Sequence, residues 1–269
     1  MSTAQIIEAA ELLTGHGAVV FDCRFSLADP EAGRAQYLQG HVPGAHFLDL
    51  NGDLAGAVAD HGGRHPLPAA ADFAALLAAH GVGPDTRVVA YDDSRFAGGA
   101  RLWWLMRSLG YRPPRLLNGG YQAWLAAGGE PEAAVPATTA HPASDSPRDA
   151  FAGHCDIEGL RLAQGEGAVL VDSREERRYQ GLEEPIDPVA GHIPGAINRP
   201  WQGVTCAAGN LRDVQDLQQH WGDALEAERL VIYCGSGITA CVNLFSLAAL
   251  GREDATLYAG SWSDWSSYL

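Results

Sequence analysis

The feature that most constrains the fold of this 269-residue chain is an internal repeat. The segments "AVVFDCR" and "GHVPGA" of the first half return as "AVLVDSR" and "GHIPGA" in the second half. Four landmark pairs occur in the same order: Asp22 and Asp172, His41 and His192, Tyr91 and Tyr233, and Gly120 and Gly260. Such self-similarity predicts two copies of one structural unit. We therefore expect domains at 1–130 and 151–269, joined by a Pro- and Ala-rich linker at 131–150.

Each copy alternates short β-rich runs with longer helical patterns. The runs "RVVAY" and "RLVIYC" are rich in β-branched residues, whereas "AAADFAALLAAHG" and "VQDLQQHWGDAL" have the composition and spacing of helices. This alternation predicts mainly parallel sheets with helices on both faces. The expected fold class is therefore α/β.

Charge and hydrophobicity exclude several classes of partner. The formal net charge is -15, which makes the surface repulsive to nucleic acid. The N-terminal stretch "MSTAQIIEAAELL" lacks the basic segment of a signal peptide, and no apolar run approaches the roughly 18 to 20 residues of a membrane span. We expect a cytoplasmic protein that binds neither nucleic acid nor a membrane.

The cysteines point to a single reactive thiol. They are odd in number and widely spread, at Cys23, Cys155, Cys206, Cys234 and Cys241. None belongs to a C-x-x-C pair, which disfavours a disulfide framework and a zinc site. We expect no metal. Cys234 differs from the others because it follows a β-rich run and opens the loop "CGSGIT" ahead of a helical pattern.

This loop is expected to form an anion-binding cradle with a nucleophile at its base. Its residues are Cys234, Gly235, Ser236, Gly237, Ile238 and Thr239. Ligands of parallel α/β sheets bind at the carboxyl ends of strands, where loop amides and a helix N-terminus stabilise a thiolate. The two glycines allow the loop to curl, and the two hydroxyl groups add hydrogen-bond donors.

Other interpretations of the thiol are weaker. An unpaired cysteine is often a small core residue, and we expect this role for Cys241, two helical turns further on. A tyrosine-phosphatase-type loop needs an arginine six residues after the cysteine, and this chain has Ala240 there. Phosphate ester chemistry is therefore disfavoured.

The motifs "DCR" and "DSR", "GHVPGA" and "GHIPGA", "YCGSGITA" and "YAGSWSDW" together resemble the tandem-domain rhodanese sulfurtransferases. The resemblance spans nearly the whole chain and implies two rhodanese-like domains, of which only the C-terminal one is catalytic. Asp92, in the first-copy position that matches Cys234, cannot carry a persulfide. The implied partners are a small-molecule sulfur donor and an acceptor such as cyanide, a small thiol or a thioredoxin-like protein. No metal or organic cofactor is implied.

Within that family, a loop without basic residues looks like the 3-mercaptopyruvate branch. Thiosulfate is a dianion whose departing sulfite needs adjacent positive charge. By resemblance, Arg178 of "RRYQG" would hold the donor carboxylate, while Asp187 replaces a second arginine usual in this branch. Arg199 of "AINRPW" is a candidate to bind the donor anion in place of that second arginine. A thiosulfate-using enzyme and a non-catalytic sulfur carrier remain as alternatives.

Two further roles follow from the repeated motifs. The resemblance places His41 near the cleft between the domains and implies proton transfer there, whereas His192 more simply closes a turn. The pairs Asp22 with Arg24 and Asp172 with Arg174 are expected to fix loops, and the tryptophans of "RLWW" and "SWSDW" are expected in the core.

Overall fold

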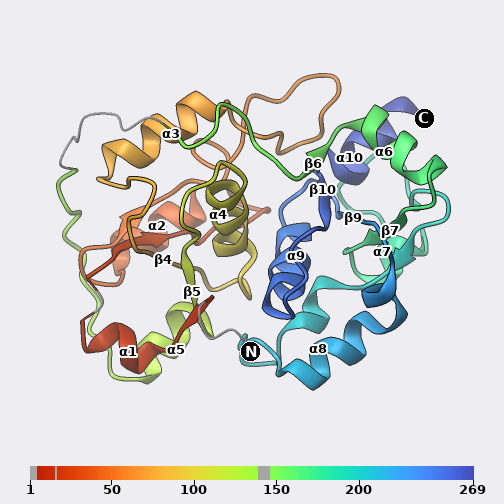
Figure 1. Cartoon of the computed structure of the whole chain (residues 1–269). Helices are drawn as coiled ribbons and strands as arrows, with labels where there is room; N and C mark the ends of the chain where they lie inside the picture. The colour runs from red at the N-terminus through yellow and green to blue at the C-terminus, as the bar shows by residue number, and fades with distance from the viewer. Residues whose placement is uncertain (1–4, 16, 139–145) are drawn as a thin grey trace.

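The computed structural model describes residues 5–15, 17–138 and 146–269. Within these residues each sequence copy forms its own five-stranded sheet, and every pairing between strands of the sheets is parallel. The two halves lie side by side, with helices around each sheet (Figure 1). The predicted α/β fold with two tandem domains is confirmed. Part of the predicted linker, 139–145, lies outside the described residues.

The first sheet has the strand order β1-β5-β4-β2-β3. Its strands are β1 (Ile6–Ile7), β2 (Val19–Asp22), β3 (His46–Phe47), β4 (Val88–Tyr91) and β5 (Arg115–Leu117). The helices of this half are α1 (Ala9–Leu13), α2 (Ala32–Gln39), α3 (Ala70–Ala79), α4 (Ala97–Ser108) and α5 (Gly120–Ala126).

The second sheet repeats this arrangement with the order β6-β10-β9-β7-β8. Its strands are β6 (His154–Cys155), β7 (Val169–Asp172), β8 (Ile197–Asn198), β9 (Leu230–Tyr233) and β10 (Thr256–Tyr258). Its α-helices are α6 (Ile157–Gly165), α7 (Glu176–Tyr179), α8 (Val214–Trp221), α9 (Ala240–Ala249) and α10 (Ser261–Trp265). Three 3₁₀ helices are described in this half: η1 (Trp201–Val204), η2 (Gly222–Glu226) and η3 (Ser266–Tyr268). No helix in the described part of the chain is both long and apolar enough to cross a membrane.

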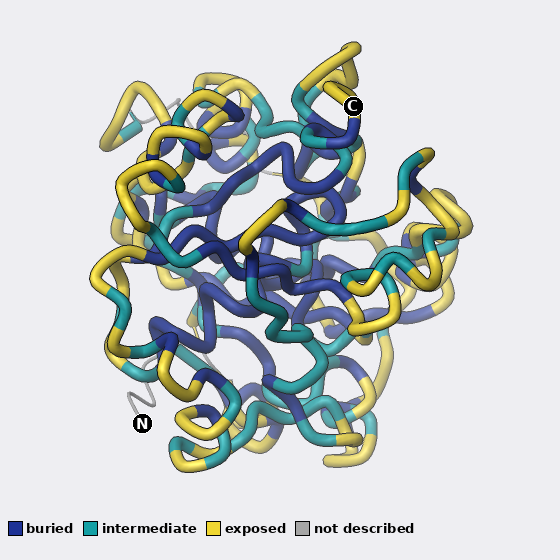
Figure 2. Tube along the Cα trace, turned by 90° about the vertical axis from the view of Figure 1, so that its right-hand side faces the viewer, coloured by how far each residue is buried: buried dark blue, intermediate teal, exposed yellow. Residues whose placement is uncertain are grey.

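The central strands are covered on both faces, as their unbroken apolar runs predict. Successive residues of β4 face opposite sides: Val88 and Ala90 join one hydrophobic cluster, and Val89 and Tyr91 join another. The first cluster includes residues of α3 and α4, and the second includes residues of α1 and α5. Figure 2 shows this buried interior as dark stretches through the middle of the molecule.

The repeated charge pairs fix equivalent turns in the two domains. Arg24 lies 2.6 Å from the carboxylate of Asp22 and donates to the carbonyl of Gly40 at 2.8 Å. Arg174 lies 2.7 Å from Asp172 and donates to the carbonyl of the matching glycine at 2.6 Å. All four charged side chains are buried. The predicted role of these pairs is confirmed.

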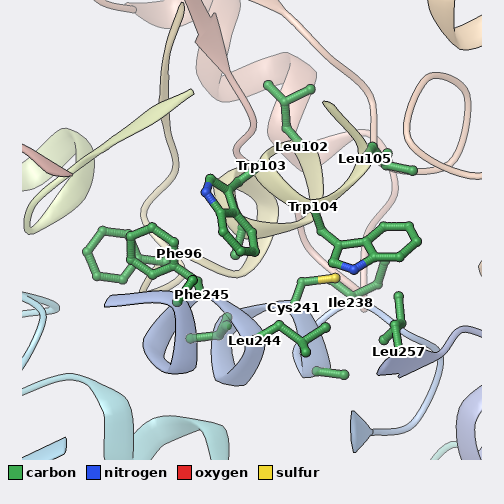
Figure 3. Packing of buried hydrophobic residues seen from close by; sticks show 14 of the residues in the cluster. Phe96, Leu102, Trp103, Trp104, Leu105, Ile238, Cys241, Leu244, Phe245 and Leu257 are labelled. Carbon is green, nitrogen blue, oxygen red and sulfur yellow. The ribbon is translucent and has the colours of Figure 1, made fainter. Parts of the chain in front are cut away.

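The two domains share one core, in which α4 packs against α9. All ten residues of α9 are buried. The ring of Phe245 on α9 lies 5.4 Å from Trp103 and 5.7 Å from Phe96, measured between ring centroids. Figure 3 shows these rings meeting between the two helices. The tryptophans Trp103, Trp104 and Trp262 are buried as expected, whereas Trp265 is only partly buried.

Candidate active site

Cys234 is the first residue after β9, at the carboxyl end of the second sheet. It is buried, with 2% of its surface exposed. The amide of Gly237 donates to Cys234 Sγ at 3.2 Å, and the amide of Cys234 donates to the hydroxyl of Ser261 at 3.1 Å. An N–H group directed at the sulfur stabilises negative charge on it. The loop therefore has the inward-facing amide that the sequence predicts.

Gly237 is required for the shape of this loop. Its φ of +80° lies in the left-handed region, and a Cβ at this position would lie 2.4 Å from the carbonyl oxygen of Ala259. Both constraints exclude larger residues. The loop carbonyls are held as well, because the amides of Trp262 and Ser263 donate to Cys234 and Gly235 at 3.0 and 2.9 Å.

The last two residues of the loop differ in their surroundings. Ile238 is 3% exposed and belongs to the core cluster shared by the domains (Figure 3). Its side chain anchors the loop in the core. Thr239 is half-buried and directly precedes α9.

Ser236 contacts a histidine from the other domain. Its Oγ lies 2.7 Å from Nδ1 of His65, and both residues are buried. Burial, followed by the nearby charges of Arg101 and Arg64, lowers the pKa of His65 from 6.5 to about 4. The imidazole is therefore neutral at neutral pH and can exchange a hydrogen bond with the hydroxyl.

Arg101 connects this histidine to the loop of residues 234–239. It lies on α4, is fully buried, and donates to the carbonyls of Gly237 and His65 at 3.1 Å each. Further bonds reach the carbonyls of Leu54 at 3.1 Å and Pro66 at 3.2 Å. One guanidinium from the first domain thus fixes the positions of both partners.

Arg178 reaches the loop, as the resemblance implies. A Cβ built on Gly235 would lie 3.5 Å from Arg178 Nη1. The guanidinium also donates to Glu184 at 2.6 Å and to Asp187 at 3.3 Å. Asp187 pairs in addition with Arg64 of the first domain. A Cβ on Gly235 would lie 3.3 Å from Arg64 Nη2, so two guanidinium groups flank this glycine.

The structure corrects the expectation for His41. This residue is fully buried, its Nδ1 lies 2.8 Å from the carbonyl oxygen of Tyr37, and its ring stacks on Tyr37 with centroids 4.0 Å apart. His192 makes the same contacts with Tyr179, at 2.7 and 4.0 Å. Because both copies use the histidine alike, it closes a turn in each, and the histidine that reaches the loop is His65.

Arg199 also lies elsewhere. Its guanidinium donates to the carbonyl of Trp221 at 3.3 Å and to that of Asn198 at 2.9 Å. These bonds satisfy backbone acceptors at the end of α8 and at the end of β8. The structure therefore corrects the suggestion that Arg199 replaces the second anion-binding arginine.

The first domain retains the cradle but fills it with its own carboxylate. Asp92 is buried and accepts hydrogen bonds from the amides of Ser94, Phe96 and Gly99 at 2.8, 3.1 and 2.8 Å. Burial raises the pKa of this carboxyl to about 6. An anion built into the chain thus occupies the position matching the Cys234 sulfur.

A cavity of about 370 Å³ lies beside Arg64 and His65. Apolar side chains such as Phe25, Leu27, Val58 and Ile186 line it, together with the polar residues Arg24, Ser26, Asp49 and Asn51. A larger open depression of about 740 Å³ near Gln218 and Arg252 contains none of the loop residues. The lining of the smaller cavity also contains none of the loop residues, but its His65 lies 2.7 Å from Ser236 Oγ, measured from Nδ1. In the described residues no group of three or more His, Cys, Asp or Glu side chains could hold a metal ion.

Sequence reasoning missed Arg64, His65 and Arg101. Both Arg64 and His65 belong to the Gly- and Pro-rich stretch "HGGRHPLP" of the first copy, which has no counterpart in the second. A charged and titratable pair confined to one copy was a usable signal. Arg101 gave a weaker signal of a functional role, because it lies within an apolar helical pattern.

The comparisons with known proteins agree with this geometry. The model of the Rhodanese-like domain matches residues 6–127 and 158–268. A Pseudomonas aeruginosa protein named "Probable 3-mercaptopyruvate sulfurtransferase" is 42% identical over 98% of this chain and 96% of its own length. SseB of Mycobacterium tuberculosis, whose name refers to a thiosulfate sulfurtransferase, is 39% identical over 97% of this chain and 94% of its own. The solved structure of the 3-mercaptopyruvate sulfurtransferase from Leishmania major has a TM-score of 0.87 at 32% identity, covering 99% of this chain and 75% of that one.

Proposed function

The chain belongs to the rhodanese family and is a sulfurtransferase, and we propose that it transfers sulfur from 3-mercaptopyruvate to an acceptor through a persulfide on Cys234. One observation carries the proposal. The amide of Gly237 lies 3.2 Å from the Cys234 sulfur, while the guanidinium of Arg178 flanks the adjacent Gly235. The nucleophile Cys234 and Arg178, the anchor for the donor carboxylate, therefore lie at the same loop.

The first half-reaction balances without a cofactor. Arg178 orients the donor, and the thiolate of Cys234 attacks the donor's sulfur. A sulfur–sulfur bond forms, the carbon–sulfur bond breaks, and its electron pair leaves as the enolate of pyruvate, which takes a proton. In the second half-reaction a thiol or cyanide removes the outer sulfur and restores the thiolate. The Gly237 amide stabilises the anionic sulfur in both states.

Ser236 and His65 serve the leaving group. In one neutral tautomer, Nδ1 of His65 donates to Ser236 Oγ, which leaves the hydroxyl proton free to donate to the enolate oxygen. Because burial lowers the pKa of His65 to about 4, the imidazole stays neutral throughout the neutral range and this tautomer remains accessible. The hydrogen bond strengthens as charge develops on the oxygen.

The charges around the loop favour a donor with one carboxylate. The guanidinium groups of Arg64, Arg174 and Arg178 are matched by the carboxylates of Asp172, Glu184 and Asp187. Arg101 adds a fourth guanidinium, which bonds to carbonyls and not to a carboxylate. The single charge of a monoanionic donor balances this cation, whereas thiosulfate adds one negative charge more. Thiosulfate remains the second candidate donor, because two guanidinium groups flank Gly235 and because SseB is named for that activity.

The acceptor and the location belong to the same proposal. We include small thiols and a thioredoxin-like protein as acceptors, because the cavity beside Arg64 and His65 is lined largely by apolar groups and admits an uncharged thiol. A cytoplasmic location is part of the proposal, since thiol acceptors are kept reduced there.

Mass spectrometry of the protein after exposure to each donor tests this function. Cys234 should gain one sulfur atom from 3-mercaptopyruvate, and the peptide containing Cys241 should gain none. Cys234→Ser should abolish both the gain and turnover, because a serine hydroxyl cannot hold a persulfide. Cys241→Ala should still gain sulfur. Turnover by the folded Cys234→Ser variant would exclude the mechanism, and a higher kcat/KM for thiosulfate would assign the donor to the alternative.

A further inference from the structure

The segment 260–268 contacts both parts of the candidate active site. It contains most of the motif that closes the second sequence copy, and α10 lies within it. Toward its own domain, the amide of Trp262 donates to the carbonyl of Cys234 at 3.0 Å. Toward the first domain, the segment packs against residues 61–63, which shortly precede His65. One segment therefore supports both the nucleophile and the stretch that carries the histidine.

Asp264 makes a buried hydrogen bond across this contact. The residue is 4% exposed, and its Oδ1 accepts from the backbone amide of Gly62 at 2.7 Å. Its Oδ2 accepts from the hydroxyl of Tyr258, on β10, also at 2.7 Å. The carboxylate is thus fixed by the second domain through one oxygen and holds the first domain through the other.

The same stretch approaches the segment 260–268 at two further points. A Cβ on Gly63 would lie 2.4 Å from the carbonyl oxygen of Gly260, so this close approach requires glycine. His61 Nδ1 lies 2.7 Å from Ser267 Oγ, and its ring stacks on Tyr268 with centroids 4.0 Å apart. The backbone of the first domain therefore lies directly against the segment.

The copy without a nucleophile lacks this aspartate. The amide of Tyr121 donates to the carbonyl of Asp92 at 2.9 Å, which makes Tyr121 the structural counterpart of Trp262. Two residues further on, the first domain has Ala123 where the second has Asp264. The fold that both copies share therefore does not require a carboxylate at this position.

We propose that Asp264 is a positioning residue for persulfide formation, because it holds Gly62 so that His65 meets Ser236. This inference rests on the proposed function. The backbone before the histidine contains Gly62 and Gly63, whose φ angles of +99° and +82° belong to a conformationally permissive stretch. An anchor three residues before His65 limits the positions of its ring. A small displacement of a group that serves the leaving oxygen is costly in rate.

Asp264→Ala should slow the first half-reaction selectively. Single-turnover persulfide formation at saturating 3-mercaptopyruvate should fall at least about tenfold. Transfer of sulfur from persulfide already formed on Cys234 to a thiol should change much less, because His65 serves the enolate and not the acceptor. Asp264→Asn should recover most of the rate, since its amide oxygen can accept from the Gly62 amide.

Tyr258→Phe is the matched control. It removes the other hydrogen bond of the same buried carboxylate and leaves the bond to Gly62 in place. Its rate of persulfide formation should match that of the wild-type protein. The double variant Tyr258→Phe with Asp264→Ala removes the carboxylate together with the hydroxyl that would otherwise lose its partner. It should be as slow as Asp264→Ala, and it keeps the test valid if the single variant folds poorly.

A double-mutant cycle with His65 distinguishes positioning from a general loss of structure. In the His65→Ala background, Asp264→Ala should change the rate of persulfide formation by less than about twofold, because the group that it positions is absent. Hydrogen exchange provides a readout independent of activity. The amide of Gly62 should exchange faster in Asp264→Ala than in the wild-type protein or in Tyr258→Phe.

Three outcomes would overturn the inference while leaving the proposed function intact. The first is a folded Asp264→Ala variant, alone or with Tyr258→Phe, that forms the persulfide at the wild-type rate. The second is an equal loss of rate on replacing Asp264 with and without His65, which would show a structural role. The third is unchanged exchange of the Gly62 amide in Asp264→Ala. Failure of the wild-type protein to gain sulfur on Cys234 would instead contradict the proposed function itself, before any variant is compared.

Discussion

Cys234 and Cys241 are two buried thiols that share one backbone neighbour but have opposite surroundings. Gly237 donates its amide to the sulfur of Cys234, while its carbonyl accepts a hydrogen bond from the thiol of Cys241 at 3.3 Å. Burial raises the pKa of Cys241 to about 12, so this thiol stays protonated at neutral pH. The residue type alone does not distinguish a nucleophile from a core residue, but the backbone group that each sulfur contacts does: an N–H for Cys234 and a carbonyl for Cys241.

Replacement of Arg178 should weaken binding of the donor more than binding of the acceptor. Arg178→Ala is expected to raise the KM for 3-mercaptopyruvate at least about tenfold and to change the KM for a neutral thiol much less, because only the donor has a carboxylate. Steady-state kinetics with both substrates varied measures the two constants. Arg177→Ala is the control, since this neighbour is 68% exposed and pairs with Glu183 at 2.9 Å. Equal losses for donor and acceptor would mean that Arg178 has a structural role.

At the scale of elements, α4 and α9 are the contact through which one domain supports the chemistry of the other. The catalytic loop leads directly into α9, and α4 carries Arg101 beneath that loop. Removing the Arg101 guanidinium would leave buried carbonyls in both domains without this donor. The helix pair therefore links the stability of the core to the position of the nucleophile.

Arg101→Met should lower both stability and kcat. The loss of four hydrogen bonds, three of them buried, is expected to cost about 3 kcal/mol in the free energy of unfolding, since buried acceptors that lose a donor are expensive. Urea unfolding measures the first effect, and single-turnover persulfide formation measures the second. Arg101→Lys should recover part of both, because an ammonium can satisfy some of the acceptors. A stable variant with wild-type kcat would show that Arg101 does not position the loop.

The elements differ in how far the sequence predicts them. The central strands β2, β4, β7 and β9 are runs rich in β-branched residues, which made them predictable. The strands β1, β3, β6 and β8 have two residues each, too few for any periodicity. The bond between His65 and Ser236 joins residues 171 positions apart, and local patterns contain no information about such a pairing. The loop that holds Cys234, the proposed nucleophile, was thus predictable, whereas the contact of His65 with that loop was not.

At the scale of the whole molecule, the partly buried His220 makes the free energy of unfolding fall at acid pH. Burial, followed by Arg199 and Arg212, lowers the pKa of His220 on α8 from 6.5 to about 4. The unfolded chain therefore binds the proton first as pH falls. The stability that His220 contributes is present above about pH 6.5 and is lost progressively toward pH 4.

His220→Gln should reduce this loss. Between pH 7 and 4.5 the wild-type protein should lose about 2 kcal/mol more stability than the variant, given 1.36 kcal/mol per unit of pKa shift. Urea unfolding at both pH values measures the difference. Comparing the change with pH, and not the stability at one pH, removes any packing effect of the substitution. Identical losses of stability between the two pH values in the wild-type protein and the variant would contradict the assignment of this pH dependence to His220.

The ion pair between Arg64 and Asp187 also affects how this molecule can evolve. The two residues lie in different copies of the ancient duplication, so a change in one half alters the electrostatic environment that the other half has inherited. Recombination that exchanged one half for that of a distant relative would separate the pair and leave a charge without its counterpart. We expect substitutions at the two positions to occur together in related proteins, because a change at only one of them would leave the other charge without its counterpart.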